Sequence, residues 1–232
     1  MPDLSFEIIN AEIPPFAVTP TLIFKLRITN MGAENAIHSI SLRSQIQIAA
    51  NQRSYSAEAQ SRLLELFGAP HRWGTTLHPL LWTHSNTVIP QFRASVVVDL
   101  PISCTYDFEV ATTKYFDALE DGEIPLNFLF SGTTFYEGKE ARLQVEQIPW
   151  SREASYRLPV TTWKEMIARY YPNSAWIRLH KDVFNQLYQY KATHSLPTWE
   201  DAITRLLQVS SQPTTILAAA QPEEAKNEER YS

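Results

Sequence analysis

The stretch LIFKLRI, residues 22–28, decides the class of fold that this sequence predicts. Its apolar residues stand at every second position from Leu22 to Ile28, and the basic residues Lys25 and Arg27 lie between them. A period of two residues is typical of a β-strand that buries one face and exposes the other. The stretch therefore predicts a half-buried strand.

Four further segments repeat this alternation within residues 1–150, at 40–48, 96–100, 106–110 and 124–130. Gly, Pro or Asn residues separate the segments, as in chains that fold into short antiparallel strands. The expected architecture for this part of the chain is a sandwich of two antiparallel sheets.

One helical segment interrupts the series, SAEAQSRLLELFG at residues 56–68. Ser56 is a favoured N-cap residue, an apolar stripe follows it, and Gly68 is typical of a helix end. We therefore expect a helical insertion between two strands of the sandwich.

The hydrophobic period changes after Trp150. Thr162 and Glu165 have the spacing of a capping box, and apolar residues follow them at helical spacing. A second apolar stripe runs through residues 183–188, and a third follows Thr198, which is a suitable cap. These patterns predict three helices of about three turns each.

Three short helices cannot bury their many aromatic residues alone, so we expect them to pack on the sandwich. The prediction is an α+β protein with a β-sandwich domain at residues 1–150 and a helical domain at residues 151–208. From residue 209 the sequence is rich in Ser, Gln, Pro, Ala and Glu without a sustained period. This composition predicts a disordered tail at residues 209–232.

The composition limits the functional classes. The chain has 232 residues, of which 44% are hydrophobic, enough for a large core. Its N-terminus does not resemble a signal peptide, and no window approaches the roughly 20 apolar residues of a membrane span. The net charge is −5, and the basic residues of the helical part are spread rather than clustered. We expect a cytoplasmic protein that binds neither membranes nor nucleic acid.

The single cysteine, Cys104, excludes an internal disulfide and any zinc site with two thiolates. It shares the apolar face of its predicted strand with Phe108 and Val110. We therefore expect a buried thiol that packs as a small hydrophobic group rather than a nucleophile.

Residues 71–84, HRWGTTLHPLLWTH, hold three of the six histidines and two of the six tryptophans. In an extended strand His78 and His84 lie roughly 20 Å apart. They cannot share one metal ion, whose ligands lie about 2 Å from it, so we expect no metal site here. Trp73 and Trp82 are candidates for binding a ligand or a partner, with packing in the core or at an interface as the alternative.

Two further pairs are candidate functional residues. Trp176 and Ile177 form an apolar pair between two predicted helices, where they present a docking patch or bridge the helices and the sandwich. Asp107 and Glu109 lie about 7 Å apart on the polar face of a predicted strand, a spacing that acid/base pairs use, although a solvated strand face is the alternative. An acidic cluster around Gly122 does not follow the calcium-loop spacing, so we expect a solvated turn there.

Five blocks of the sequence carry a family resemblance: PLLWTH (79–84), VDLPISCTYDFEV (98–110), IPLNFLFSGT (124–133), PWSREASYRLPV (149–160) and YPNSAWIRL (171–179). Together they resemble an uncharacterised bacterial family, a domain of unknown function. The resemblance covers nearly the whole chain from Leu4 to about Leu207. It implies an accessory or assembly role, because genes of that family often lie near those for nickel-iron hydrogenases and their maturation proteins. No functional residue is known for the family, so none is carried over.

A second resemblance concerns architecture alone. The run LRITNMGAENAIHSISL, residues 26–42, is similar to the passage between the second and third strands of immunoglobulin-like domains. It implies an immunoglobulin-like sandwich, although the paired cysteines of antibody domains are absent. This architecture hosts many unrelated functions.

The expected function is a non-catalytic protein-interaction or accessory module that binds another protein and needs no cofactor. It rests on the absence of a catalytic motif, on the abundant aromatic residues and on the implied neighbourhood of hydrogenase genes. Two alternatives stay open. One is a small-ligand binder in which Trp73, Trp82 or Trp150 stacks a flat or sugar-like molecule, and the other is a hydrolase that uses Asp107 and Glu109 or a nearby histidine.

Overall fold

The computed structural model describes residues 2–32, 36–104, 110–138, 142–173 and 179–211. The chain divides into two compact units, residues 1–176 and 177–232, and each unit is described by itself.

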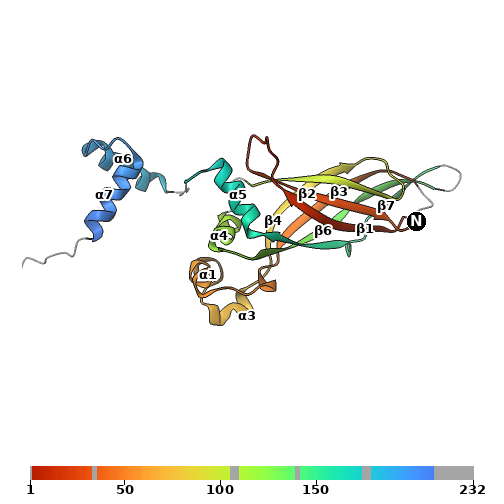
Figure 1. Ribbon diagram of the computed structural model, residues 1–232, viewed down its shortest axis with the longest axis horizontal. Coiled ribbons are helices and arrows are strands. Elements are labelled where there is room, and N and C mark those ends of the chain that lie inside the picture. The colour runs from red at the N-terminus through yellow and green to blue at the C-terminus, as the bar shows by residue number, and fades with distance from the viewer. Residues whose placement is uncertain (1, 33–35, 105–109, 139–141, 174–178, 212–232) are drawn as a thin grey trace, which may run out of the picture. The chain divides into compact units, whose positions relative to one another are not determined.

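The first unit holds two antiparallel β-sheets (Figure 1). Three strands in the order β1-β2-β5 form one sheet, and strands in the order β4-β3-β6-β7 form the other, in which β8 also pairs with β6. The strand bounds are β1 Leu4–Glu12, β2 Thr21–Asn30, β3 Ile37–Ile48, β4 Leu80–Ile89, β5 Ser95–Ser103, β6 Glu123–Glu137, β7 Leu143–Gln147 and β8 Glu153–Pro159.

The two sheets pack face to face, which confirms the predicted sandwich. Phe6 of β1 stacks on Phe130 of β6 with ring centroids 4.6 Å apart, and the rings of Phe24 and Phe128 lie 5.1 Å apart. Strand β2, which contains LIFKLRI, is the central strand of its sheet, and its alternate apolar residues from Leu22 onward have no exposed surface. The alternation therefore exists because one face of β2 meets the opposite sheet.

Five helices gather at one end of the sandwich, the end opposite the N-terminus in Figure 1. The predicted insertion is confirmed: Ser56 caps α1 by accepting a hydrogen bond from the backbone N–H of Ala59 (3.2 Å), and Gly68 ends α2 at a φ of 71°. The helix bounds are α1 Ala57–Arg62, α2 Leu64–Phe67, α3 Trp73–Thr76, α4 Val110–Ala118 and α5 Val160–Tyr170, with short 3-10 turns at Ala50–Gln52 and Pro70–Arg72.

The strand predicted at 106–110 is corrected at its last residue. Val110 begins helix α4, and residues 106–109 lie outside the described residues, so the prediction for them stays untested. The buried residues Tyr115, Phe116 and Leu119 anchor α4 and the turn after it. Their spacing of one and four residues is typical of a helix.

The switch from strands to helices occurs later in the chain than predicted, after Pro159 rather than after Trp150. Residues 153–159 form strand β8, so the sandwich continues beyond the predicted domain boundary, and the first unit extends to Trp176. Helix α5 belongs to this unit and packs on it as expected, with the Trp163 ring 4.3 Å from that of Phe116. The predicted capping box of α5 is wrong: the helix starts at Val160, two residues before Thr162, and its N-terminus has no side-chain cap.

The second unit contains helices α6 (Lys181–Thr193) and α7 (Trp199–Ser211). The cap predicted at Thr198 is confirmed, because its Oγ1 accepts a hydrogen bond from the backbone N–H of Asp201 (3.0 Å). Helix α7 extends into the segment predicted as a tail from residue 209, and residues 212–232 lie outside the described part of the chain.

Candidate interaction site

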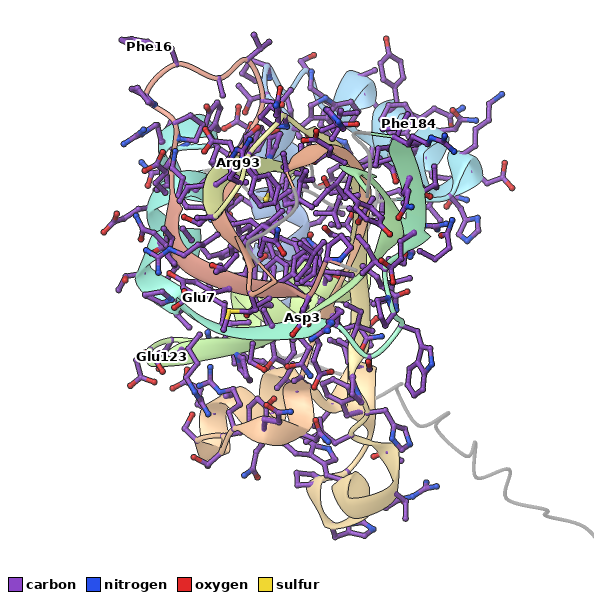
Figure 2. The ribbon with its side chains drawn as sticks, turned by 90° about the vertical axis from the view of Figure 1, so that its right-hand side faces the viewer. Asp3, Glu7, Phe16, Arg93, Glu123 and Phe184 are labelled. Carbon is purple, nitrogen blue, oxygen red and sulfur yellow. The ribbon has the colours of Figure 1, made fainter. Side chains whose placement is uncertain are left out.

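The loop between β1 and β2, residues 13–20 with the sequence IPPFAVTP, presents two bare apolar side chains. Phe16 is 97% exposed and Val18 is 101% exposed, so neither touches the body of the protein. Figure 2 shows Phe16 standing away from the sandwich at the tip of this loop. A fully exposed phenylalanine is costly in water and suits a site that another surface covers.

Hydrogen bonds hold the backbone of the loop along its length, including at Ala17 between the two bare side chains. The Tyr170 hydroxyl of α5 donates a hydrogen bond to the carbonyl of Ala17 (2.9 Å), and the Arg169 guanidinium donates one to the carbonyl of Pro14 (3.5 Å). At the far end the carbonyl of Pro20 accepts from the backbone N–H of Cys104 (2.8 Å). These bonds fix the conformation of the loop before any partner arrives.

The elements that fix the loop are themselves anchored in the core. Tyr170 is half-buried against the core, at the end of the helix whose Trp163 packs on Phe116. Cys104 follows β5 and is buried, as predicted. The loop therefore presents the bare side chains of Phe16 and Val18 on a backbone that core elements hold in place.

Sequence reasoning missed this site. The pair Pro14-Pro15 directly before Phe16 is a signal for this site. Two consecutive prolines exclude a regular strand, and an aromatic residue outside strands and helices is not held in a core by its secondary structure.

The structure places Trp82 in the core and so corrects its choice as a binding residue. Its ring is 3% exposed and packs edge-on against Phe24 (6.0 Å) and Phe116 (5.2 Å). Strand β4 carries one extra residue at this point, since Ile46 pairs with Thr83 while Gln47 pairs with Leu81. The bulge directs the indole inward, where no ligand from solvent can stack on it.

Trp73 is half-buried and belongs to an aromatic cluster under the helical insertion. Its ring packs edge-on against Tyr55 (5.2 Å) and Phe67 (6.0 Å), and its indole N–H donates to the carbonyl of Gly68 (2.9 Å). The Tyr55 and Tyr115 hydroxyls lie 2.8 Å apart in the same cluster. Burial raises the pKa of both phenols above the ordinary value of 10, that of Tyr115 much further.

The acidic turn around Gly122 borders an open groove of about 680 Å³ that Arg53 and Arg157 also line. Arg53 donates hydrogen bonds to the carbonyls of Asp121 (3.3 Å) and Glu123 (3.0 Å), so it ties this turn to the start of the helical insertion. The mixture of charges in the groove favours neither a cation nor an anion.

Of the other predicted residues, one is exposed and four lie outside the part of the chain that the structure describes. Trp150 is 90% exposed in the turn between β7 and β8. The pair Trp176 and Ile177 and the pair Asp107 and Glu109 lie outside the described residues. The structure brings none of the described candidates together into one site.

The described residues contain no group of three or more His, Cys, Asp or Glu side chains that could hold a metal ion. None of their helices combines the length and apolar character that crossing a membrane requires.

Comparison with solved structures finds remote similarity. A late embryogenesis abundant protein is 14% identical, over 68% of this chain and 73% of the other, with a TM-score of 0.32. A CARDB domain from Pyrococcus furiosus, solved with di-metal ions, is 11% identical over 68% and 92% of the two chains (TM-score 0.27). A β-glucosidase 3B from Thermotoga neapolitana is 10% identical over 67% and 17% (TM-score 0.25). At these values none of them assigns an activity or a ligand to the chain.

Comparison of sequences identifies a family for the chain but no curated relative. No curated protein matches the chain. A family model described as a family of unknown function (DUF6084) matches residues 1–215.

Proposed function

Since the chain belongs to DUF6084, a family of unknown function, we propose a role for it from its own geometry: a non-catalytic protein-interaction or accessory module. The observation that carries the proposal is the firmly held β1–β2 loop with Phe16 and Val18 bare at its tip. The sandwich serves as the scaffold for this loop.

The physical reason is the energetics of interface anchors. A phenylalanine that enters a pocket on a partner removes about 150–250 Å² from water, and such aromatic anchors dominate interface free energies. Because Tyr170 and Pro20 already fix the loop, binding loses little conformational entropy. Phe16 and Val18 therefore fit a partner that offers an apolar pocket.

We propose a subunit or maturation protein of a nickel-iron hydrogenase as the partner, in a bacterial cytoplasm. The five sequence blocks that resemble a hydrogenase-associated family support this choice of partner. The lone buried thiol of Cys104 is compatible with a reducing compartment.

We further propose that the sandwich is immunoglobulin-like. Its strand order supports this: the first, second and fifth strands form one sheet, and the third, sixth and seventh lie in the other. The fourth strand pairs with the third, whereas in the constant-type immunoglobulin domain it joins the first sheet.

The experiment compares capture of partners from the native host by three tagged proteins, namely wild type, Phe16→Asp and Val88→Asp. Val88 is exposed on β4 away from the loop, so its substitution introduces the same charge as a control. We expect specific proteins to be captured by wild type and Val88→Asp and lost with Phe16→Asp. With a purified partner the Phe16→Asp affinity should fall about 30-fold or more, the loss of an interface hot spot. Equal capture by all three proteins contradicts the proposal.

A further inference from the structure

Helices α6 and α7 leave most of their apolar side chains uncovered. Among the described residues of these helices only Ala202 is buried. Trp199 at the start of α7 makes the contact between them, with its ring 5.4 Å from that of Phe184 and 6.2 Å from that of Tyr188. Large apolar residues on both helices stay partly exposed in spite of this contact: Val183, Phe184, Tyr188, Ile203, Leu206, Leu207 and Val209.

The apolar residues of α7 form one continuous stripe. Trp199, Ala202, Ile203 and Leu206 follow the spacing i, i+3, i+4 and i+7, and Leu207 and Val209 flank the stripe at either side. Gln208 lies on the opposite side of the helix, since it is two residues from Leu206. The stripe is therefore a surface for packing against another helix.

The helices need this cover. Each has 13 residues, a length at which an isolated helix is marginal in water. Their ends are nevertheless well specified, because Thr198 and Asp201 cap α7 reciprocally: the Asp201 carboxylate also accepts from the backbone N–H of Thr198 (3.2 Å). Well-formed ends together with a bare apolar stripe indicate that the stripe is an interface.

We propose that this surface is a homodimer interface, in which the α7 stripe packs on the α6–α7 pair of a second copy of the chain. The proposal is independent of the Phe16 loop, which lies in the other unit. Seven half-exposed apolar side chains present on the order of 600 Å², close to the ~800 Å² that each partner buries in an interface of standard size.

The charges also favour a second copy. The described part of α6 has one excess positive charge and α7 has one excess negative charge, so α6 of one copy is complementary to α7 of the other. In a dimer with two-fold symmetry this α6–α7 contact occurs twice. The charged residues are Lys181, Lys191 and Asp182 on α6 and Glu200, Asp201 and Arg205 on α7.

The test measures the mass of the full-length protein by sedimentation equilibrium. The chain has a mass of 26.6 kDa, and we expect wild type to sediment at twice that value at about 100 μM, where even a 10 μM dimer is mostly assembled. The double variant Leu206→Glu/Leu207→Glu should weaken the dimer at least tenfold. Gln208→Glu adds a negative charge on the opposite side of α7 and should leave the dimer intact.

Directed cross-linking provides a second readout that does not depend on a destabilising variant. A bifunctional thiol reagent should join two copies of Leu206→Cys and not of Gln208→Cys, because Leu206 lies in the proposed interface and Gln208 lies on the opposite side of α7. The native Cys104 is buried and does not compete. A wild-type monomer, or a dimer that the double glutamate variant leaves unchanged, overturns the proposal. Partner capture through Phe16 should persist in the double variant, so the two surfaces can fail separately.

Discussion

At the scale of single residues, an extra position in β4 determines the role of Trp82. The bulge between its pairings with Ile46 and Gln47 turns the indole inward, where it contacts Phe24 and Phe116. Trp150, in a turn, is exposed instead. Tryptophan thus stabilises the core at position 82 and contributes little packing at position 150.

We predict that Trp82→Ala lowers the free energy of unfolding by about 3–5 kcal/mol, because it leaves a large cavity between the sheets. Trp150→Ala, at a position that is 90% exposed, should change it by less than about 0.5 kcal/mol. Urea denaturation followed by circular dichroism measures both. Equal effects of the two substitutions contradict the assignment of Trp82 to the core.

The buried phenol of Tyr115 predicts a loss of stability at alkaline pH. Burial raises its pKa in the folded protein, whereas in the unfolded chain the phenol ionises near pH 10. Its contribution is therefore fully present below pH 10 and is lost as the pH rises from 10 towards the higher folded-state pKa, by about 1.4 kcal/mol per pH unit.

The measurement is the unfolding midpoint of wild type, Tyr115→Phe and Tyr188→Phe as a function of pH. Tyr115→Phe loses the hydrogen bond to Tyr55, which costs about 1 kcal/mol at neutral pH, yet its stability should fall less steeply above pH 10. Tyr188→Phe changes a residue of the other unit, so the pH dependence of the sandwich should follow the wild type. If the unfolding midpoints of all three proteins fall in parallel above pH 10, ionisation of Tyr115 does not cause the loss of stability.

At the scale of elements, β6 depends on a glycine where it crosses β3. Gly132 has a φ of 143°, and a Cβ there would lie 2.1 Å from the backbone carbonyl oxygen of Ser41 on the paired strand. The backbone of this long strand therefore accepts only glycine at that position.

We predict that Gly132→Ala destabilises the protein by about 2–5 kcal/mol, from the unfavourable φ together with the clash. Gly74→Ala is the matched control, because a Cβ at that position of α3 meets no atom within 4 Å. Thermal unfolding of the two variants compares them directly. A loss of the same size in both contradicts the approach of β3 as the cause, because Gly→Ala at an unstrained helical position should not destabilise.

The elements that the sequence predicted correctly are those in which one face meets a core. Strand β2 alternates because its neighbours β1 and β5 and the opposite sheet enclose it, and α1 has a local cap in Ser56. Strand β8 also alternates, with Ala154, Tyr156 and Leu158 on its less exposed side, but its seven residues directly precede a helical stripe that extends the predicted helical domain back to residue 151. Helix α4 escaped prediction because its start follows an apparent alternation. In segments this short, the elements that pair or pack with them decide between strand and helix.

At the scale of the whole molecule, the sequence predicted the sandwich but not its extent. The first unit ends at Trp176 rather than near Trp150, since β8 and α5 complete it. The pair Pro14-Pro15 marks the candidate loop in the sequence but does not predict that Phe16 is bare. The exposure of Phe16 is a property of the folded chain. Trp82 was chosen for its chemistry, and the structure uses it in the core.

The central claim is that Phe16 is the point at which this protein meets its partner. The most direct test replaces Phe16 with a photoreactive phenylalanine analogue in the native host and compares it with the same analogue at His84, an exposed position on β4. We predict one discrete cross-linked protein from position 16 and none from position 84. Absence of any adduct at position 16, or the same adduct from both positions, contradicts the account.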